Sequence, residues 1–300
     1  MSDFLIHTSI NARRYVMDHL KERMREFERE RGGSVTLKTP GHDHSKSWIL
    51  ESLAGAGLPD VMLSHGSDFS VMEEQREWDL FSSRSPWSGV PSLHQGSAPF
   101  HDPAGILHPI FVVPMVPVYN RNLVQPGELA GNWFDLLDKS RKVIFPDKDT
   151  PISKAVMAYL KRTWPEEYPG FRKKVSFGGS PVEVVQAVGS GQFHMGISNV
   201  SFSMMAKQRN VEIDPPSEGA IPLPQVLAWN KQASPELSIV HEFLMEETLQ
   251  RYLEEQGFWA VVDIPENGRF PVPRWKSPWA GWEDFFSGLR DLEREEISNA

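Results

Sequence analysis

Short apolar segments alternate with longer amphipathic ones over the first 65 residues, and this alternation limits the fold more than any other feature of the chain. The segments 4–7, 34–38 and 60–64 have the length and composition of β-strands. The segments 11–31 and 45–56 between them repeat apolar residues at helical spacing. Strands that are separated by helices pair in parallel, because a parallel pair needs a long crossover connection. We therefore predict an α/β fold whose ligand-binding loops follow the carboxyl ends of the strands.

Two apolar segments further along the chain contain prolines. They are IFVVPMVPVY at 110–119 and IPLPQVLAW at 221–229. Pro114 and Pro117 cannot donate hydrogen bonds to a neighbouring strand. The first segment therefore suits a sheet edge or a crossing between lobes better than a sheet centre. The residues between the two segments repeat the alternation of strands and helices.

This arrangement predicts two Rossmann-like lobes connected by a two-strand hinge. The first lobe is expected to be discontinuous, with residues 1–113 and 222–300, and the second lobe is expected to span residues 114–221. The acidic segment 282–296 is expected to form a last helix that packs on the first lobe.

The composition narrows the class of protein. The formal charge of −9 argues against a nucleic-acid-binding protein, whose affinity comes largely from Lys and Arg on phosphates. The absence of cysteine excludes disulfides, thiolate catalysis and Cys-based metal centres. No apolar run approaches the ~18–20 residues that a membrane-spanning helix needs. The start of the chain, MSDFLIHTSINARRY, lacks the pattern of a secretory leader, so we expect either a cytoplasmic protein or the mature form of an exported one.

The motifs of several common enzyme classes are missing. The sequence has no P-loop, no G-x-S-x-G, no H-E-x-x-H, and no G-x-G-x-x-G after a strand. Acidic pairs such as Glu73-Glu74 have the pattern of solvated helix faces. We therefore expect a protein that binds a ligand, is not an enzyme and uses no cofactor.

Five stretches carry a resemblance to a known family. Along most of the chain run PDVMLSHG, HPIFVVPMVPVYNRNL, NWFDLLDKSRKVIFPDKDTPIS, GGSPVEVVQAVGSGQFHMGIS and PPSEGAIPLPQVLAWNKQASPE. In this order they resemble a type-2 periplasmic solute-binding protein, in the branch that includes receptors for ferric iron, thiamine, sulfate and polyamines. The resemblance implies the type-2 periplasmic-binding-protein fold, hinge closure around a small solute, and delivery of that solute to an ABC permease by a monomer.

In the ferric branch, the resemblance implies metal ligands in the loops after the first and third strands and in an adjacent tyrosine pair of the second lobe. The matching positions here are Asn11, His65 and the pair Ser201–Phe202. Fe(III) prefers phenolate and carboxylate oxygen, which none of these side chains offers. None of the chain's five tyrosines is adjacent to another. We therefore expect no ferric binding in the family's manner and no metal centre.

Helix starts and strand ends supply the other candidates for a binding site. Thr150 and Ser180 precede predicted helices, where exposed amides and the helix dipole favour anions, although both residue types are also ordinary N-caps. His42, in PGHDHSKSW, belongs to a solvated loop, to the ligand site or, with His44 and His65, to a metal site. The full set of predicted ligand-binding residues is Ser9, Asn11, His42, His65, Gly66, Thr150, Ser180, Ser198, Asn199, Ser201 and Glu218.

Most of these residues are neutral hydrogen-bond donors, so the predicted ligand is a small polar solute that is anionic or zwitterionic. Glu218 would repel an anion and suits the amine of a zwitterion. Local turns explain Ser9, Ser198 or Asn199 equally well when each is taken alone. The leading hypothesis is the substrate-binding component of an ABC import system, periplasmic or extracellular if exported. The alternative is a cytoplasmic ligand sensor or regulator that uses the same fold without a transporter.

Overall fold

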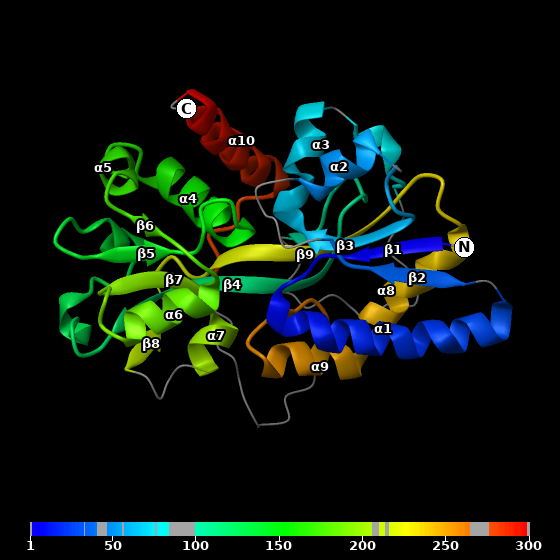
Figure 1. Ribbon diagram of the computed structural model, residues 1–300, viewed down its shortest axis with the longest axis horizontal. Helices are drawn as coiled ribbons and strands as arrows, with labels where there is room; N and C mark the ends of the chain where they lie inside the picture. The colour runs from blue at the N-terminus through cyan, green and yellow to red at the C-terminus, as the bar shows by residue number, and fades with distance from the viewer. Residues whose placement is uncertain are drawn as a thin grey trace. The chain divides into compact units, whose positions relative to one another are not determined.

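The structure of the chain is a computed structural model (Figure 1). It describes residues 2–32, 34–40, 47–55, 57–75, 77–83, 100–205, 210–213, 216–264 and 276–298. The chain divides into two compact units. Unit 1 comprises Met1–Val112 and Pro224–Val272, and unit 2 comprises Val113–Leu223 and Pro273–Ala300.

The sheet of unit 1 begins with parallel strands. β1 (Ser2–Ile6) pairs in parallel with β2 (Val35–Lys38) on one side and with β3 (Val61–His65) on the other. β3 pairs in turn with the antiparallel strand β9 (Ile221–Trp229). The predicted parallel α/β arrangement of the first 65 residues is confirmed. Because β1 and β3 are neighbours with the same direction, the loops that follow them lie side by side.

The long helix α1 (Ile10–Arg31) connects β1 to β2. Its buried residues Ala12, Val16, Leu20 and Met24 are spaced four residues apart, so one stripe of the helix packs on the core of unit 1. The sequence predicted this helix to within one residue. On the other side of the strands lie α2 (Trp48–Ala54) and α3 (Ser70–Gln75), as Figure 1 shows.

Unit 2 repeats the pattern with shorter strands. β5 (Val143–Phe145) pairs in parallel with β6 (Ser176–Phe177) and with β7 (Met195–Asn199). The helices α4 (Pro151–Thr163) and α6 (Pro181–Gly189) lie on opposite sides of these strands (Figure 1). Part of the core of this unit consists of seven buried residues, Val118, Ile144, Val184, Val185, Val188, Phe202 and Val211.

The two proline-bearing segments form long strands that run from one unit into the other. β4 (His108–Asn120) and β9 each contain a boundary between the units. The option of a sheet edge for β4 is wrong, because this strand has β9 on one side and β7 on the other in the strand order. Pro117 lies opposite Ile197 of β7, so the strand tolerates proline in a paired position.

The C-terminal helix differs from its prediction. α10 (Trp282–Ser298) belongs to unit 2, where the sequence predicted packing on the first lobe. Its buried face packs on α4, with Gly288 close to Ala158, and ion pairs join the two helices: Lys161 with Glu295 at 2.5 Å, Lys154 with Glu293 at 4.0 Å, and Arg162 with Asp284. Acidic residues at the solvated side of a helix gave no indication of which unit supplies their partners.

The segment 239–255 forms two helices, α8 (Ile239–Leu244) and α9 (Glu247–Glu255). None of the helices in the described parts of the chain is long and apolar enough to cross a membrane. The remaining elements are η1 (Gly66–Phe69), η2 (Trp78–Leu80), η4 (Pro126–Glu128), η5 (Trp133–Leu137), α5 (Tyr168–Arg172), α7 (Val200–Met205), β8 (Val211–Ile213), η7 (Pro235–Ser238) and β10 (Trp259–Ala260).

Candidate functional site

A buried cluster of polar side chains lies at the carboxyl ends of β1 and β3 in unit 1. The register of these strands brings His7 next to β3, where its backbone N–H donates to the carbonyl of Leu63 at 2.8 Å. His7 Nδ1 lies 2.8 Å from the Asp68 carboxylate. Ser64 Oγ donates to the same carboxylate oxygen and lies 3.3 Å from His7 Nδ1. His7, after β1, and Ser64, in β3, therefore meet at one oxygen atom of Asp68.

Asp68 is the charged centre of this cluster. Trp48 Nε1 also donates toward Asp68 Oδ2, at 3.3 Å. Burial acts to raise the pKa of the Asp68 carboxyl, but the charge and hydrogen bond of His7, with smaller effects of His65 and Ser64, hold this pKa well below its ordinary value. Asp68 is therefore a carboxylate at neutral pH, although its side chain is only 14% exposed.

Gln225 of β9 links the two loops from a third strand. Its Oε1 accepts a hydrogen bond from Thr8 Oγ1 at 2.9 Å, and its Nε2 lies 2.6 Å from His65 Nδ1. All three residues are buried. The rings of His65 and His7 meet edge to face, with centroids 5.2 Å apart. The cluster is thus continuous from Asp68 through the two imidazoles to β9.

The start of α1 adds hydrogen-bond donors. Ser9 is the N-cap residue, but its hydroxyl donates to Asn11 Oδ1 at 2.6 Å and does not cap the helix. Arg13 reaches back to the carbonyl of Thr8 at 3.2 Å, and burial lowers the pKa of its guanidinium. Three buried polar atoms have no hydrogen-bond partner here: Asn11 Nδ2, Arg13 Nε and Ser67 Oγ. Such atoms are costly in an empty protein, so they suggest a place for acceptor atoms of a ligand.

In unit 2, the two predicted helix-start residues are N-caps. Thr150 accepts from the backbone N–H of Ser153 at 3.3 Å and donates to the carbonyl of Asp147 at 2.7 Å. Ser180 forms a capping box with Glu183, in which each side chain accepts from the backbone of the other residue. Both side chains are therefore used by the fold itself.

The residues predicted to follow β7 are part of that strand or of α7. Ser198 and Asn199 are the last residues of β7 and are fully buried, and Ser201 is buried in α7. Asn199 Oδ1 accepts from the N–H of Phe202, and its Nδ2 has no partner. Of these three predicted residues, Asn199 therefore shows an unused buried donor.

Glu218 lies in a loop that is fixed by the segment before β5. Ser217 N donates to the carbonyl of Gly131 at 2.6 Å, and Trp133 Nε1 donates to the carbonyl of Gly219 at 2.8 Å. Gly219 has φ +97°, and a Cβ there would lie 1.7 Å from the carbonyl oxygen of Lys276, so only glycine fits. The Glu218 carboxylate accepts from the Ser217 hydroxyl at 3.0 Å.

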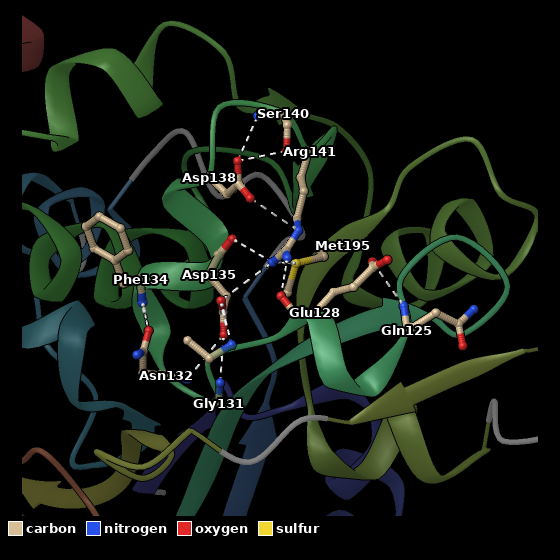
Figure 2. Close-up of polar contacts among 11 residues, drawn as sticks. Gln125, Glu128, Gly131, Asn132, Phe134, Asp135, Asp138, Ser140, Arg141 and Met195 are labelled. Carbon is tan, nitrogen blue, oxygen red and sulfur yellow. Dashed lines mark hydrogen bonds and ion pairs between the residues drawn. The ribbon is translucent and has the colours of Figure 1, made fainter.

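A second polar centre holds that segment in place (Figure 2). Asp135 accepts hydrogen bonds from the backbone N–H groups of Ala130, Gly131 and Asn132, at 3.0, 3.0 and 3.3 Å. Arg141 lies 3.6 Å from this carboxylate and donates to the carbonyl of Glu128 at 2.7 Å. Both side chains are nearly buried, at 11% and 10% exposed, and this ion pair fixes the backbone that supports the Glu218 loop.

The predicted set is therefore divided between the units. In unit 1, Ser9 and Asn11 contact each other at the start of α1, and His65 and the buried Gly66 lie at the end of the neighbouring strand β3. His42 lies outside the described residues, and its predicted alternatives are not decided. No group of three or more His, Asp or Glu side chains in the described ranges is arranged to hold a metal ion.

Sequence reasoning missed six members of the unit 1 cluster: His7, Thr8, Trp48, Ser64, Asp68 and Gln225. Gln225 could have been found, because it is the one polar side chain in the apolar run IPLPQVLAW. His7 and Thr8 also follow directly from the rule that ligand-binding loops start where a parallel strand ends. The hydrogen bonds to Asp68 have no comparable signal in the sequence.

A family model described as a bacterial extracellular solute-binding protein matches residues 56–287. The chain belongs to this family. The predicted type-2 periplasmic solute-binding fold is confirmed by solved structures that cover the whole chain.

A ferric binding protein from Campylobacter jejuni has a TM-score of 0.75 and 15% identity, with 98% of each chain covered. A Trichodesmium protein (IdiA, FutA) in complex with iron and citrate has a TM-score of 0.73 and 18% identity, again with 98% of each chain covered. A periplasmic thiamin binding protein has a TM-score of 0.63 and 14% identity, with 97% of this chain and 95% of that chain covered. A comparison with curated proteins finds no match. At these identities the likeness of the solute-binding protein to solved structures shows its fold alone.

Proposed function

We propose that this solute-binding protein is the substrate-binding component of an ABC import system and has no catalytic activity. Its ligand is a small polar solute, anionic or zwitterionic, which it traps by hinge closure with β4 and β9 as the hinge strands. Loops of both units supply the ligand-binding residues. The family and the absence of a membrane-spanning helix in the described parts of the chain support a protein that works at the periplasmic or extracellular side, with a permease as partner.

The observation that carries the ligand class is the set of unused donors in unit 1. Asn11 Nδ2, Arg13 Nε and Ser67 Oγ are buried and without partners. Ser67 is 8% exposed, so solvent does not satisfy its hydroxyl well. A ligand that supplies acceptor oxygens would satisfy all three atoms, and the partly desolvated Arg13 would strengthen the attraction of a negative charge.

The acidic residues limit this ligand further. The Asp68 carboxylate already has His7 Nδ1 at 2.8 Å and the Ser64 hydroxyl as partners, so it does not by itself exclude an anion from the same loops. Glu218 keeps a carboxylate in unit 2 whose only described partner is the Ser217 hydroxyl. Glu218 therefore suits the amine of a zwitterionic ligand better than an anionic group.

A thermal-shift screen tests the proposal, because a ligand that binds the native state raises the unfolding temperature. We expect a stabilising compound among phosphate esters, phosphonates, sulfonates and amino acids. Asn11→Ala should reduce this shift, whereas Ser217→Ala, at an exposed position, should leave it unchanged for a purely anionic compound. If only polyamines or other cations stabilise the protein, and Glu218→Gln abolishes that effect, the anionic ligand class is wrong.

The cellular role has a separate test. Fractionation of the source cells should place the protein outside the inner membrane, and cross-linking should recover a permease. A protein found only in the cytoplasm, without a permease partner, would instead support the sensor or regulator with the same fold.

A further inference from the structure

We propose that Gln225 is a positioning residue that holds the proton of His65 on Nε2, so that His65 acts as a hydrogen-bond donor in the ligand site and not as a metal ligand. The inference deepens the proposed function, because it names how one residue of that site is prepared for an acceptor-rich solute. It rests on the contacts of the Nδ1 atom of His65 and on the orientation of one amide group.

The orientation of the Gln225 amide follows from its neighbours. Nε2 lies 3.4 Å from the carbonyl oxygen of Pro224, which can only accept a hydrogen bond. Turning the amide by half a turn would place Oε1 against this carbonyl, with two acceptors facing each other. In the described orientation, Oε1 instead accepts from the Thr8 hydroxyl at 2.9 Å. The amide is therefore held at both ends, with its N–H groups toward His65.

This orientation determines the tautomer of His65. Gln225 Nε2 donates to His65 Nδ1 over 2.6 Å, so Nδ1 is the acceptor and carries no proton. The proton of the neutral ring then resides on Nε2. A histidine that binds a metal through one nitrogen normally donates the N–H of the other to a carboxylate or carbonyl. His65 has the opposite arrangement, because the nitrogen that contacts Gln225 is an acceptor.

His7 shows the contrasting arrangement in the same cluster. Its Nδ1 faces the Asp68 carboxylate at 2.8 Å, and a carboxylate can only accept, so His7 carries a proton on Nδ1. Nδ1 therefore carries a proton in His7 and none in His65, although the ring centroids are only 5.2 Å apart. An amide partner and a carboxylate partner, supplied by β9 and by η1, account for the difference.

The decisive measurement needs no ligand. In protein with ¹⁵N-labelled histidine near neutral pH, long-range ¹H–¹⁵N correlation spectra distinguish ring nitrogens that carry a proton from those that do not. We expect His65 Nδ1 to be unprotonated and Nε2 protonated, with the signals assigned from their loss in His65→Asn. His7 Nδ1 should be protonated. A protonated Nδ1 and an unprotonated Nε2 on His65 in the unaltered protein would overturn the proposal.

Gln225→Glu tests the cause. A carboxylate at this position accepts from His65 Nδ1, so the Nδ1 signal should change to the protonated type. Gln250→Glu is the matched control, since Gln250 is an equally buried glutamine of unit 1 that contacts the carbonyls of Ile110 and Leu244 and no histidine. It should leave the His65 signals in place. If Gln225→Glu does not fold, Thr8→Val removes one of the two contacts that orient the amide and should shift the His65 Nδ1 signal partway.

A binding measurement connects the tautomer to the solute. With inorganic phosphate as the probe, Gln225→Glu should weaken binding about tenfold or more, as expected when a donor to a charged acceptor is lost beside a new negative charge. If phosphate does not bind even the unaltered protein, the anionic ligand class fails, but the tautomers measured by spectroscopy still decide the role of Gln225. If the tautomers are as stated and both proteins bind phosphate equally, the role of His65 as a donor to the ligand is wrong.

Discussion

The strand-end loops of the two units use their polar side chains differently. In unit 2, Thr150 and Ser180 complete the ends of their own helices, and Asp135 satisfies three backbone N–H groups. In unit 1, Ser9 stands at the start of α1 without capping it, and Asn11 and Ser67 keep buried donors without partners. Apart from Asn199 Nδ2 at the end of β7, these side chains of unit 2 are therefore satisfied by the fold, whereas Asn11 and Ser67 of unit 1 are not.

This difference separates residues that a fold needs from residues that a ligand needs. A capping serine costs about 1 kcal/mol when it is lost, because a backbone donor then has no partner. A buried donor that is already without a partner costs stability while it is present. A ligand or an ordered water that supplies the acceptor removes this cost. The comparison thus predicts opposite effects of similar substitutions in the two units.

The largest effect is expected at the polar centre of unit 2. Asp135→Ala leaves three backbone donors without their acceptor and removes the carboxylate that faces Arg141, so the unfolding free energy should fall by about 3–5 kcal/mol. Urea unfolding followed by tryptophan fluorescence measures this loss.

The matched control for this prediction is Asp138→Ala. Asp138 also faces Arg141, at 3.6 Å, but its side chain is 42% exposed. Its loss should cost about 1 kcal/mol or less. Equal losses for the two substitutions would show that the loops of unit 2 do not depend on the buried carboxylate.

A smaller effect concerns the acid stability of unit 1. Burial, assisted by His108, lowers the pKa of His241 to about 3. At a pH below the ordinary histidine pKa, the ring gains a proton when the protein unfolds, and this proton uptake favours the unfolded state. The stability that the neutral ring contributes is therefore complete above about pH 6.5 and is lost as the pH falls toward the pKa of the folded state. Between pH 6.5 and 5 the loss is about 2 kcal/mol.

His241→Leu cannot undergo this loss. The unfolding free energy of the variant, relative to that of the unaltered protein, should therefore be higher at pH 5 than at pH 7.5. The rings that face His241 are His108, with centroids 5.6 Å apart, and Trp229, at 6.2 Å. His101→Gln is the control, because His101 is exposed. Denaturation curves at several pH values test the prediction, and parallel curves for all three proteins would contradict it.

The sequence predicted the order of elements well and the site only in part. Periodicity and proline content were enough for α1, for the parallel strands of unit 1 and for the two crossing strands. The partners of Asp68 could not be predicted, because they come from positions 7, 48 and 64, which only the folded sheet brings together. The position of α10 failed for the same reason, since its acidic residues pair with Lys154, Lys161 and Arg162 of a distant helix.

A pair of buried serines makes the comparison between the units sharper. Ser203 donates to the carbonyl of Asn199 at 2.9 Å in unit 2, whereas Ser67 Oγ has no partner in unit 1. Ser203→Ala should cost about 1 kcal/mol, and Ser67→Ala should cost nothing or stabilise the protein slightly. Only Ser67→Ala should reduce the thermal shift caused by a bound anion. A loss of stability of about 1 kcal/mol in both variants would mean that Ser67 has a structural partner after all.

The smallest expected effect is the response to ferric iron, which should be absent. Phe202 stands at one of the two positions of the family's tyrosine pair, and its ring is 8% exposed in the core of unit 2. Its partner Ser201 is also buried. Neither residue offers a phenolate, and the buried ring at 202 shows that this position serves the core of unit 2.

Two tyrosines of unit 1 do lie together. Tyr15 of α1 and Tyr252 of α9 stack with ring centroids 3.6 Å apart, but burial, with a further effect of Tyr15, raises the pKa of Tyr252 and so opposes the phenolate that Fe(III) requires. Ferric titration should therefore produce no phenolate charge-transfer band in the visible spectrum. A strong band that disappears in Tyr15→Phe or Tyr252→Phe would place an iron site on these helices. A band that depends on Tyr119, Tyr159 or Tyr168 would instead place it in unit 2, and would show that the alignment of Ser201 and Phe202 with the family's tyrosine pair is wrong.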